Sequence, residues 1–464
     1  MPKGLIVSIF VLFISAIVLF SGSGCANIIP PQGGPRDSIP PELVTATPAD
    51  STRNFRGNRI TLQFNEYVDL QDVSNNLLFT PTFETNPEVS VKLKTVSVRF
   101  RDTLAKNTTY VLNFGNAIRD VNESNVNKNF VYVFSTGPAL DSLELSGKVI
   151  LAETGKTDST LQVLLHKNLD DSAVVKDRPQ YVARVDANGN FRFRNLPTGT
   201  FKIYALGNAG FARRYLNKNQ AFAFLDSAVI TGKDNNLTLY AYQETAQKPS
   251  TPTTSGKVPA AEKRLQFSTN LSSNQQDLLK DLVMTFVTPL KVFDTTQISL
   301  STDSSFNRVS YNVTLDSTRK VATFKTAWKE ATRYNLVLNK DFAEDSSGRK
   351  LLKSDTLHFT TKKLLDYAKL TVHIKNVDAK RKPVLQFVQN EQVIFSVPIT
   401  SGVITEPLFL PGEYSLRVLY DTNGNGKWDP GHFPDPKHQP EIVMPVSRTI
   451  NVKGNFENEF DIAL

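Results

Sequence analysis

The residues best suited to chemistry stand in one short loop near the C-terminus, residues 421–429. Its sequence is Asp-Thr-Asn-Gly-Asn-Gly-Lys-Trp-Asp, so Asp421, Asn423, Asn425 and Asp429 occupy positions 1, 3, 5 and 9 of a motif with glycine at position 6. Calcium prefers six to eight oxygen ligands on a flexible turn; alternate side chains and the carbonyl of Lys427 at position 7 can supply them. The spacing therefore predicts a structural calcium site.

The rest of the shell is less complete. Position 12 of the motif is His432, where a calcium loop has a bidentate carboxylate, so Asp435 or Glu441 must close the site. The alternative is an Asn-Gly-rich hairpin turn without metal, and the sequence leaves both open. A matching stretch at residues 206–211 has no carboxylate. We therefore expect at most one calcium site.

The remaining polar residues do not indicate an active site. No GxSxG, HExxH or P-loop motif occurs in the chain. His358 and His373 lie in strand patterns, where a structural histidine is the more common case. The pair Asp170-Asp171 lies between strand patterns and indicates a solvated turn. We expect no enzymatic activity.

A short pattern recurs along the whole chain: Asp, then Ser or Thr, then an apolar residue or Thr. It resembles the O-glycosylation sequon of Bacteroidota, although Asp-Ser is also an ordinary turn pair. The resemblance implies glycan on exposed copies among the following residues: Ser38, Ser51, Thr103, Ser142, Ser159, Ser172, Ser227, Thr295, Ser317 and Thr356.

The N-terminus has the features of an export signal. A largely apolar run without charges extends from Leu5 to Phe20, and small residues follow it up to Cys25, the only cysteine. The run is short for a membrane span but suits the hydrophobic region of a secretory signal. Ser23-Gly24-Cys25 resembles the end of a bacterial lipobox, although residue 22 is Gly rather than Leu or Val. The resemblance implies removal of residues 1–24 and lipidation of Cys25; the alternatives are an uncleaved anchor and a buried thiol.

The lipid would place the protein at a membrane surface, because two or more acyl chains give stable residence there. Ala26 in place of Asp resembles outer-membrane sorting, and the leaflet that faces the domains stays open. Residues 25–41 contain five prolines, which disfavour helix and sheet, so this segment is expected to be an extended tether. The formal charge of +8 is spread along the chain and does not indicate nucleic-acid binding.

The rest of the chain shows strand patterns. Apolar and polar residues alternate, with turn signals every 8–12 residues or so, as in antiparallel sandwiches. A helical turn is expected only near residues 274–282. We predict an all-β fold of tandem β-sandwiches. In the first domain, the residues expected to face the core are Ile60, Leu62, Phe64, Val89, Val91, Leu93, Val96, Val98, Phe100, Tyr110, Leu112, Phe114, Val131, Val133 and Ser135.

The chain repeats itself. Residues 104–136 and 328–361 align, so that Tyr110 corresponds to Tyr334, Asp120 to Asp345 and Phe134 to Phe359. Upstream, the stretch from Phe64 aligns with the stretch from Phe286. These segments resemble the bacterial Ig-like domain of surface-layer proteins, over residues 42–138 and 264–363.

A second pair of domains carries other motifs. Residues 185–201 contain an Asn-Gly turn, alternating phenylalanines and a Leu-Pro-x-Gly turn into a strand, and the exit recurs as Leu-Pro-Gly-Glu-Tyr at residues 410–414. They resemble the prealbumin-like sandwich of carboxypeptidase regulatory domains, over residues 139–245 and 364–464. Residues 246–263 are a Pro/Thr/Ser linker. The duplicated layout resembles Ig-like-domain lipoproteins of Bacteroidota.

These observations favour a non-catalytic outer-membrane lipoprotein that acts as a scaffold. Sandwich loops and edge strands are surfaces that dock protein partners. The partner is expected in the cell envelope, in a complex such as a β-barrel assembly or secretion machine. The alternative is a carbohydrate-binding or adhesive surface lipoprotein, which exposed aromatic residues would mark. Trp328 is expected in a core.

Overall fold

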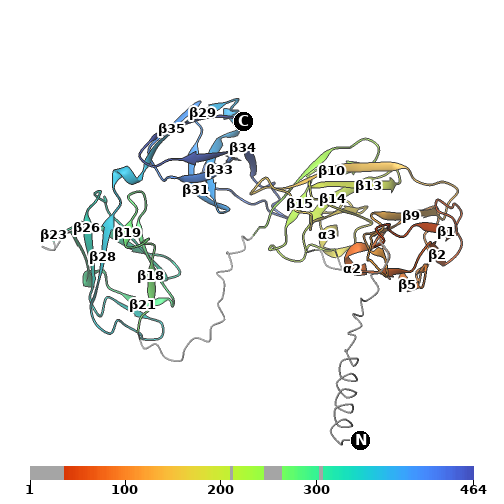
Figure 1. Cartoon of the computed structure of the whole chain (residues 1–464), viewed down its shortest axis with the longest axis horizontal. Helices are drawn as coiled ribbons and strands as arrows, with labels where there is room; N and C mark the ends of the chain where they lie inside the picture. The colour runs from red at the N-terminus through yellow and green to blue at the C-terminus, as the bar shows by residue number, and fades with distance from the viewer. Residues whose placement is uncertain (1–35, 209–212, 245–263, 303–306) are drawn as a thin grey trace, which may run out of the picture. The chain divides into compact units, whose positions relative to one another are not determined.

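A computed structural model describes residues 36–208, 213–244, 264–302 and 307–464 (Figure 1). The predicted signal and Cys25 lie outside these ranges. The chain forms two compact units, residues 1–140 and 141–464. The described part holds four β-sandwiches, which we call sandwich 1 (residues 43–135), sandwich 2 (143–241), sandwich 3 (267–361) and sandwich 4 (368–463). No helix in the described ranges is long and apolar enough to cross a membrane.

Sandwich 1 packs the sheet β1-β2-β6-β5 against the sheet β4-β7-β9, and β3 pairs with β8. Its inner faces meet in a core that is rich in phenylalanine. The elements are β1 (Leu43–Thr47), β2 (Arg59–Phe64), β3 (Val68–Leu70), α2 (Val73–Asn76), β4 (Leu78–Thr80), β5 (Glu88–Lys92), β6 (Thr95–Arg99), β7 (Thr109–Gly115), β8 (Ile118–Asp120) and β9 (Phe130–Ser135).

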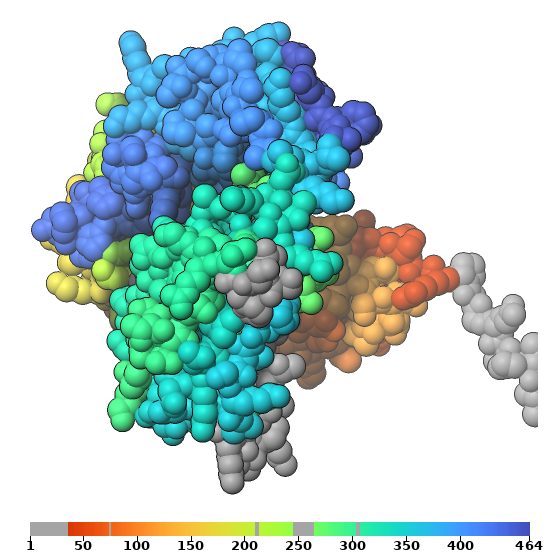
Figure 2. Space-filling view, turned by 90° about the vertical axis from the view of Figure 1, so that its left-hand side faces the viewer, coloured from red at the N-terminus to blue at the C-terminus, as the bar shows by residue number. Residues whose placement is uncertain are grey.

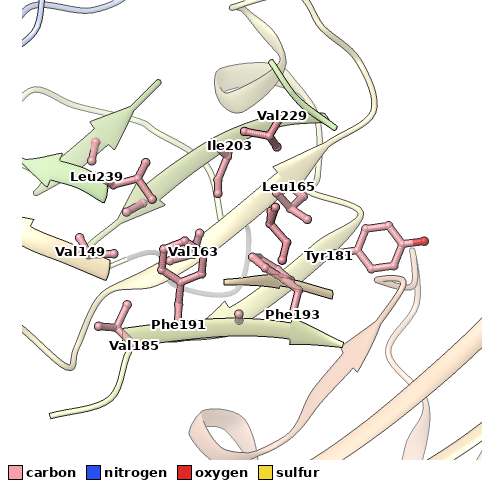
Figure 3. Packing of buried hydrophobic residues seen from close by; sticks show 14 of the residues in the cluster. Val149, Val163, Leu165, Tyr181, Val185, Phe191, Phe193, Ile203, Val229 and Leu239 are labelled. Atoms are coloured by element: carbon pink, nitrogen blue, oxygen red, sulfur yellow. The ribbon is translucent and has the colours of Figure 1, made fainter. Parts of the chain in front are cut away.

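Sandwich 2 packs the sheet β13-β10-β17 against β12-β11-β14-β15, with β16 paired to β14. Figure 3 shows Val163, Leu165 and Ile203 of the larger sheet packing toward Phe191 and Phe193. The elements are β10 (Leu143–Leu151), β11 (Gln162–His166), α3 (Ala173–Lys176), β12 (Tyr181–Arg184), β13 (Asn190–Leu196), β14 (Thr200–Leu206), β15 (Phe222–Phe224), β16 (Val229–Ile230) and β17 (Leu237–Ala241).

Sandwich 3 repeats the plan of sandwich 1, with sheets β18-β20-β25-β24 and β19-β28-β26-β22-β23 and the pair β21-β27. The elements are β18 (Phe267–Thr269), β19 (Gln275–Gln276), β20 (Leu282–Phe286), β21 (Leu290–Phe293), η1 (Thr295–Gln297), β22 (Ile298–Thr302), β23 (Asn307–Arg308), β24 (Asn312–Leu315), β25 (Val321–Lys325), β26 (Arg333–Leu338), β27 (Ala343–Asp345) and β28 (Asp355–Thr361).

Sandwich 4 repeats the plan of sandwich 2, with sheets β32-β29-β35 and β31-β30-β33-β34. Figure 2 shows sandwich 3, in green to cyan, next to sandwich 4, in blue. Tyr367, 2% exposed, joins the two, because its hydroxyl donates to Asp277 and accepts from the Leu278 N–H, both at 2.7 Å. The elements are η2 (Leu364–Asp366), β29 (Ala368–Lys375), η3 (Ala379–Arg381), β30 (Pro383–Gln389), β31 (Gln392–Pro398), β32 (Val403–Phe409), β33 (Gly412–Tyr420), β34 (Ile442–Val452) and β35 (Glu457–Ala463).

The aligned aromatic residues lie on corresponding strands of sandwiches 1 and 3. Tyr110 pairs with Phe134 across β7 and β9, and Tyr334 pairs with Phe359 across β26 and β28. Both tyrosine rings stack on their phenylalanine partners, with interplanar angles of 13° and 12°. Sandwiches 1 and 3 therefore share their central aromatic pair, and their four-stranded sheets have the same strand order.

Three local predictions are wrong. Val131 and Val133 do not face the core: the inward residues of β9 are Tyr132 and Phe134, whose larger rings fill the space between the sheets. Leu93 is 65% exposed, because the chain turns after β5 and ends the alternation at Val91. The helical turn expected at 274–282 is replaced by β19 and a turn.

Candidate functional site

The predicted calcium loop lies between β33 and β34 of sandwich 4, and Asp421 organises it. This side chain is 2% exposed, and its carboxylate accepts the N–H groups of Gly424, Asn425 and Gly426 at 2.6, 3.2 and 2.6 Å. Gly424 and Gly426 have φ of 79° and 75°, a region that glycine adopts without steric cost. The two glycines thus let the loop fold around one buried carboxylate.

The other polar side chains of the loop converge on Asp429. The amide nitrogens of Asn423 and Asn425 donate to its carboxylate at 2.6 and 2.7 Å. The amide oxygens accept backbone N–H groups, from Asn425 to Asn423 and from Lys427 to Asn425. This assignment of amide oxygen and nitrogen follows the hydrogen-bond network.

Glu441, rather than Asp435, closes the loop. Its carboxylate accepts from the Thr422 N–H and hydroxyl at 2.7 and 2.8 Å and from the Asp429 N–H at 3.1 Å. The Glu441 carbonyl also accepts the indole N–H of Trp428 at 2.8 Å. Asp435 is exposed, several residues away along the same connection. The sequence offered both acids, and the fold uses the buried one.

The donor set suits calcium chemically, because it supplies carboxylate and amide oxygens on alternate residues. In this structure, however, those oxygens accept N–H bonds within the loop. Across the described ranges no group of three or more His, Cys, Asp or Glu side chains is arranged to hold a metal ion. Calcium binding by residues 421–441 therefore stays a prediction.

Asp421→Ala should lower the free energy of unfolding by roughly 2 kcal/mol, because it removes the buried carboxylate that accepts three backbone N–H groups of the loop. The midpoint of urea unfolding measures this loss. Asp435→Ala, in the same connection but exposed, is the matched control and should leave the midpoint unchanged. Adding calcium to each protein separates the two interpretations of the loop. A calcium-dependent rise in Tm that Asp421→Ala abolishes and Asp435→Ala retains identifies a metal site; an equal rise in all three places the ion elsewhere.

The same connection carries a second feature, the insertion of Phe433 into sandwich 2. Phe433 is 1% exposed, and its ring centroid lies 4.9 Å from that of Phe222 and 5.2 Å from that of Phe224. Tyr204 and Tyr215 complete the pocket at 5.9 and 6.2 Å. Offset and edge-on contacts at these separations are favourable aromatic geometry. A residue of sandwich 4 thus packs on the outer face of a sheet of sandwich 2, whose residues lie more than 200 positions earlier in the chain.

Polar contacts surround the inserted phenylalanine. The His432 ring contacts the Glu244 carboxylate through Nδ1, and the Gln439 amide donates to the Phe224 carbonyl at 3.2 Å. Asp171 receives Lys437 at 2.6 Å and Lys202 at 3.1 Å.

Burial opposes ionisation of Asp171, but hydrogen bonds and charge from Lys437 and Lys202 outweigh it and lower the pKa of its carboxyl. The predicted turn at Asp170-Asp171 is observed, but Asp171 is only partly exposed in it, because lysines of two sandwiches contact its carboxylate.

Two further contacts extend this interface. The Val443 N–H of β34 donates to the Ala152 carbonyl at 2.8 Å, and Lys156 pairs with Glu391 at 2.7 Å, an exposed pair that adds little stability. We call the whole set, centred on Phe433, the clasp.

The sequence-based reasoning missed the clasp. A signal for its pocket was nevertheless present, since the β14 run Phe-Lys-Ile-Tyr-Ala-Leu is apolar on both faces of the strand.

The histidines of the strand patterns have structural surroundings. His358 bonds Asn335 at 2.7 Å, and His373 pairs with Glu459 at 2.6 Å. His166 is fully buried beside Tyr204, and among the described residues neither of its ring nitrogens has a hydrogen-bond partner. Burial lowers the pKa of His166 to about 4.

The Asp-Ser/Thr positions are mostly accessible. Ser172 and Thr356 are partly buried, and the others predicted to carry glycan are exposed: Ser38, Ser51, Thr103, Ser142, Ser159, Ser227, Thr295 and Ser317. Exposure permits modification of these hydroxyls, and glycosylation stays a prediction.

Comparison with solved structures gives matches at low identity. The Bacillus anthracis TIE protein is 11% identical, with 94% of this chain and 76% of that chain covered and a TM-score of 0.16. BcpA, the major pilin subunit of Bacillus cereus, is 10% identical, with 69% and 99% covered and a TM-score of 0.17. The N-terminal part of the bacterial S-layer protein SbsC is 16% identical, with 44% of each chain covered and a TM-score of 0.16. No curated protein matches the chain. A family model does match sandwich 1: residues 37–136 correspond to the family described as the bacterial Ig-like domain.

Proposed function

We propose that this protein is a non-catalytic lipoprotein that Cys25 tethers to the outer membrane, where its sandwiches serve as a scaffold for protein partners of the cell envelope. An accessory subunit of a β-barrel assembly or secretion complex is the specific role that we favour. The lipid-anchor hypothesis rests on the sequence around Cys25, and the scaffold hypothesis rests on the arrangement of the sandwiches.

The clasp is the observation that carries the scaffold hypothesis. Two sandwiches joined by a linker alone would move independently. Phe433, His432 and Lys437 instead fix sandwich 4 to sandwich 2, although residues 245–263 and sandwich 3 separate them in the chain. A rigid array of loops and edge strands is suited to holding a partner in one orientation.

The polar groups of the candidate site also favour this hypothesis over catalysis. Asp421 and Glu441 accept backbone N–H groups of their own loop, and Asp171 accepts two lysines. Each of these carboxylates therefore has a structural partner, whereas a general acid or base needs an open position toward a substrate. The hydrogen-bond partners of these carboxylates therefore favour a structural role for them over a catalytic role.

The tryptophans do not favour the carbohydrate-binding alternative. Trp328 packs edge-on against Tyr334 and Phe359, and its indole donates to the Lys280 carbonyl at 3.1 Å. Trp428 is partly buried and donates to Glu441. Both rings pack against other protein groups and are only partly exposed, so we give this function second place.

Cys25→Ser tests the anchor. The wild-type protein, expressed in a Gram-negative host with a lipoprotein-processing pathway, should incorporate radiolabelled palmitate and float with the outer membrane in a density gradient. The variant should incorporate none and leave the outer-membrane fraction, because several acyl chains account for the attachment. Flotation of the unlabelled variant with the outer membrane would contradict lipid anchoring.

Cross-linking in outer membranes from the native organism tests the scaffold role. A photoreactive residue placed at an exposed edge-strand position, such as Val393 of β31, should give one discrete adduct with a β-barrel protein. The matched control is the same residue at the exposed Leu352, in the loop between β27 and β28. Binding to glycan arrays without any protein adduct would favour the carbohydrate-binding alternative.

A further inference from the structure

One end of sandwich 1 exposes a group of apolar side chains, which we call the apolar tip: Tyr67, Leu93 and Val121. They are 51%, 65% and 56% exposed. Backbone hydrogen bonds bring their segments together, since the Val68 N–H donates to the Leu93 carbonyl and the Val121 N–H to the Tyr67 carbonyl, both at 3.1 Å. Three large apolar residues thus gather where neither the core nor a neighbouring strand covers most of their surface.

The position of Leu93 in the chain does not favour the stability of the fold. It opens the two-residue turn between β5 and β6 with a φ of 55°, a position that glycine or asparagine usually takes. The left-handed conformation is sterically unfavourable for a leucine. Beside it, the Lys94 ammonium lies 5.6 Å from the Tyr67 ring centroid. Exposed tyrosine and lysine next to apolar side chains are characteristic of surfaces at a membrane interface.

The chain enters sandwich 1 at this same end. The Asn125 amide donates to the carbonyls of Asp37 and Ile39 at 3.0 and 3.3 Å. Asn65 exchanges two hydrogen bonds with Glu42, at 2.8 and 3.0 Å. The entering segment is therefore fastened to the loops that carry the apolar tip. Between Cys25 and the first described residue, the chain can span at most about 40 Å.

The second Ig-like copy provides an internal comparison. Its Leu290 N–H donates to the Arg319 carbonyl, and its Ser346 N–H to the Pro289 carbonyl, as Val68 and Val121 do in the first copy. Arg319, Pro289 and Ser346 therefore stand where the apolar tip has Leu93, Tyr67 and Val121. Arg319 shares the φ of 55°, so the backbone is retained while the apolar character is not.

The second copy does have one exposed apolar residue at this end, Val287. It lies beside the turn that contains the charged Arg319, because the N–H of its neighbour Phe286 donates to the Lys320 carbonyl. The apolar tip thus belongs to the copy that follows the predicted anchor.

The charged residues around the apolar tip restrict the kind of lipid headgroup that it can contact. Burial raises the pKa of the Glu66 carboxyl, and the nearby carboxylates of Asp120, Asp37 and Glu123 raise it further. Lys94 is the cation that opposes them there. A surface with this acidic surround is repelled by anionic headgroups and tolerated by zwitterionic ones.

We propose that the apolar tip inserts into the headgroup region of the membrane that holds Cys25, with a preference for zwitterionic lipid, and so fixes the orientation of sandwich 1 on the bilayer. The inference rests on the proposed lipid anchor. The lipid attaches the protein to the membrane. Tyr67, Leu93 and Val121 provide a second contact, whose side chains have few rotatable bonds and can therefore fix the orientation of the domain.

Leu93→Trp tests the insertion, with Arg319→Trp as the matched control in the second copy. The full-length lipidated proteins are reconstituted into phosphatidylcholine vesicles with and without bromine on the upper acyl chain, and tryptophan emission is compared. Bromolipid should remove about half of the emission that Leu93→Trp adds to that of Trp328 and Trp428, because interfacial groups lie within reach of the upper chain. The Arg319→Trp emission should be unaffected, and replacing half of the lipid by phosphatidylglycerol should weaken the Leu93→Trp quenching.

Val121→Trp and Ser346→Trp form a second pair in the event that a turn variant folds poorly. Equal quenching within both pairs, in proteins that float with the vesicles, would overturn the insertion and leave the anchor intact. Loss of flotation in every protein, wild type included, would overturn the anchor and with it this inference. A tip that associates with a second copy instead would give quenching-insensitive emission and a dimer in chemical cross-linking, and would equally contradict insertion.

Discussion

Phe433→Ala should release sandwich 4 from sandwich 2 and weaken their contact by about 3–5 kcal/mol, the usual cost of removing a fully buried phenylalanine side chain. The ring contacts four aromatic residues and is 1% exposed, so its loss leaves a cavity in the pocket between Phe222 and Phe224. Calorimetry should then show separate transitions where the wild-type protein has a common one. Small-angle X-ray scattering should show a larger radius of gyration.

Phe456→Ala is the matched control, since this phenylalanine belongs to the same sandwich but is 64% exposed. It should leave both the calorimetric transition and the radius of gyration as they are in the wild type. A Phe433→Ala protein with unchanged scattering and a single transition at the wild-type temperature would rule out the clasp as the element that joins the two sandwiches.

His166 should make the protein lose about 3 kcal/mol of stability between pH 6.5 and pH 4. Burial lowers the pKa of this imidazole to about 4 in the folded protein, while the unfolded chain has the ordinary pKa of about 6.5. The unfolded state therefore binds a proton first as the pH falls. The stabilising contribution is complete above pH 6.5 and disappears as the pH approaches 4, which urea unfolding at a series of pH values measures.

His166→Leu removes the titrating group and should flatten the pH dependence over that interval by the same amount. His358→Leu, which replaces an exposed histidine of a strand, is the control and should retain the wild-type slope. If the free energy of unfolding depends on pH in the same way in all three proteins, His166 is not the group that links protonation to unfolding.

Local patterns were sufficient to predict the fold, because each strand carries its own alternation. Ile60, Leu62 and Phe64 are buried as the pattern predicts, at 1% exposure or less. The pattern failed at Val131, because almost every residue of β9 is apolar and alternation cannot tell which side faces inward. The space between the sheets is filled by the larger rings of Tyr132 and Phe134. It failed at Leu93 because alternation says nothing about where a strand stops.

The candidate site was predictable only in part. The glycines and oxygens of residues 421–429 indicated a tight loop, and a tight loop is observed. Phe433 was not predictable, because its partners Phe222 and Phe224 belong to another sandwich and no local spacing connects them. The sequence also offered Asp435 and Glu441 equally, and burial decides between them only when the chain is folded.

The parallel pairing of β29 with β35 has a consequence for folding. The first strand of sandwich 4 bonds its last, from Lys369 with Glu457 to Lys375 with Ala463. Contacts of such high contact order form late, since the intervening chain loses much conformational entropy when the ends meet. A nascent chain cannot close this domain until residue 463 has emerged, and until then the apolar face of β29 needs a chaperone or remains prone to aggregation.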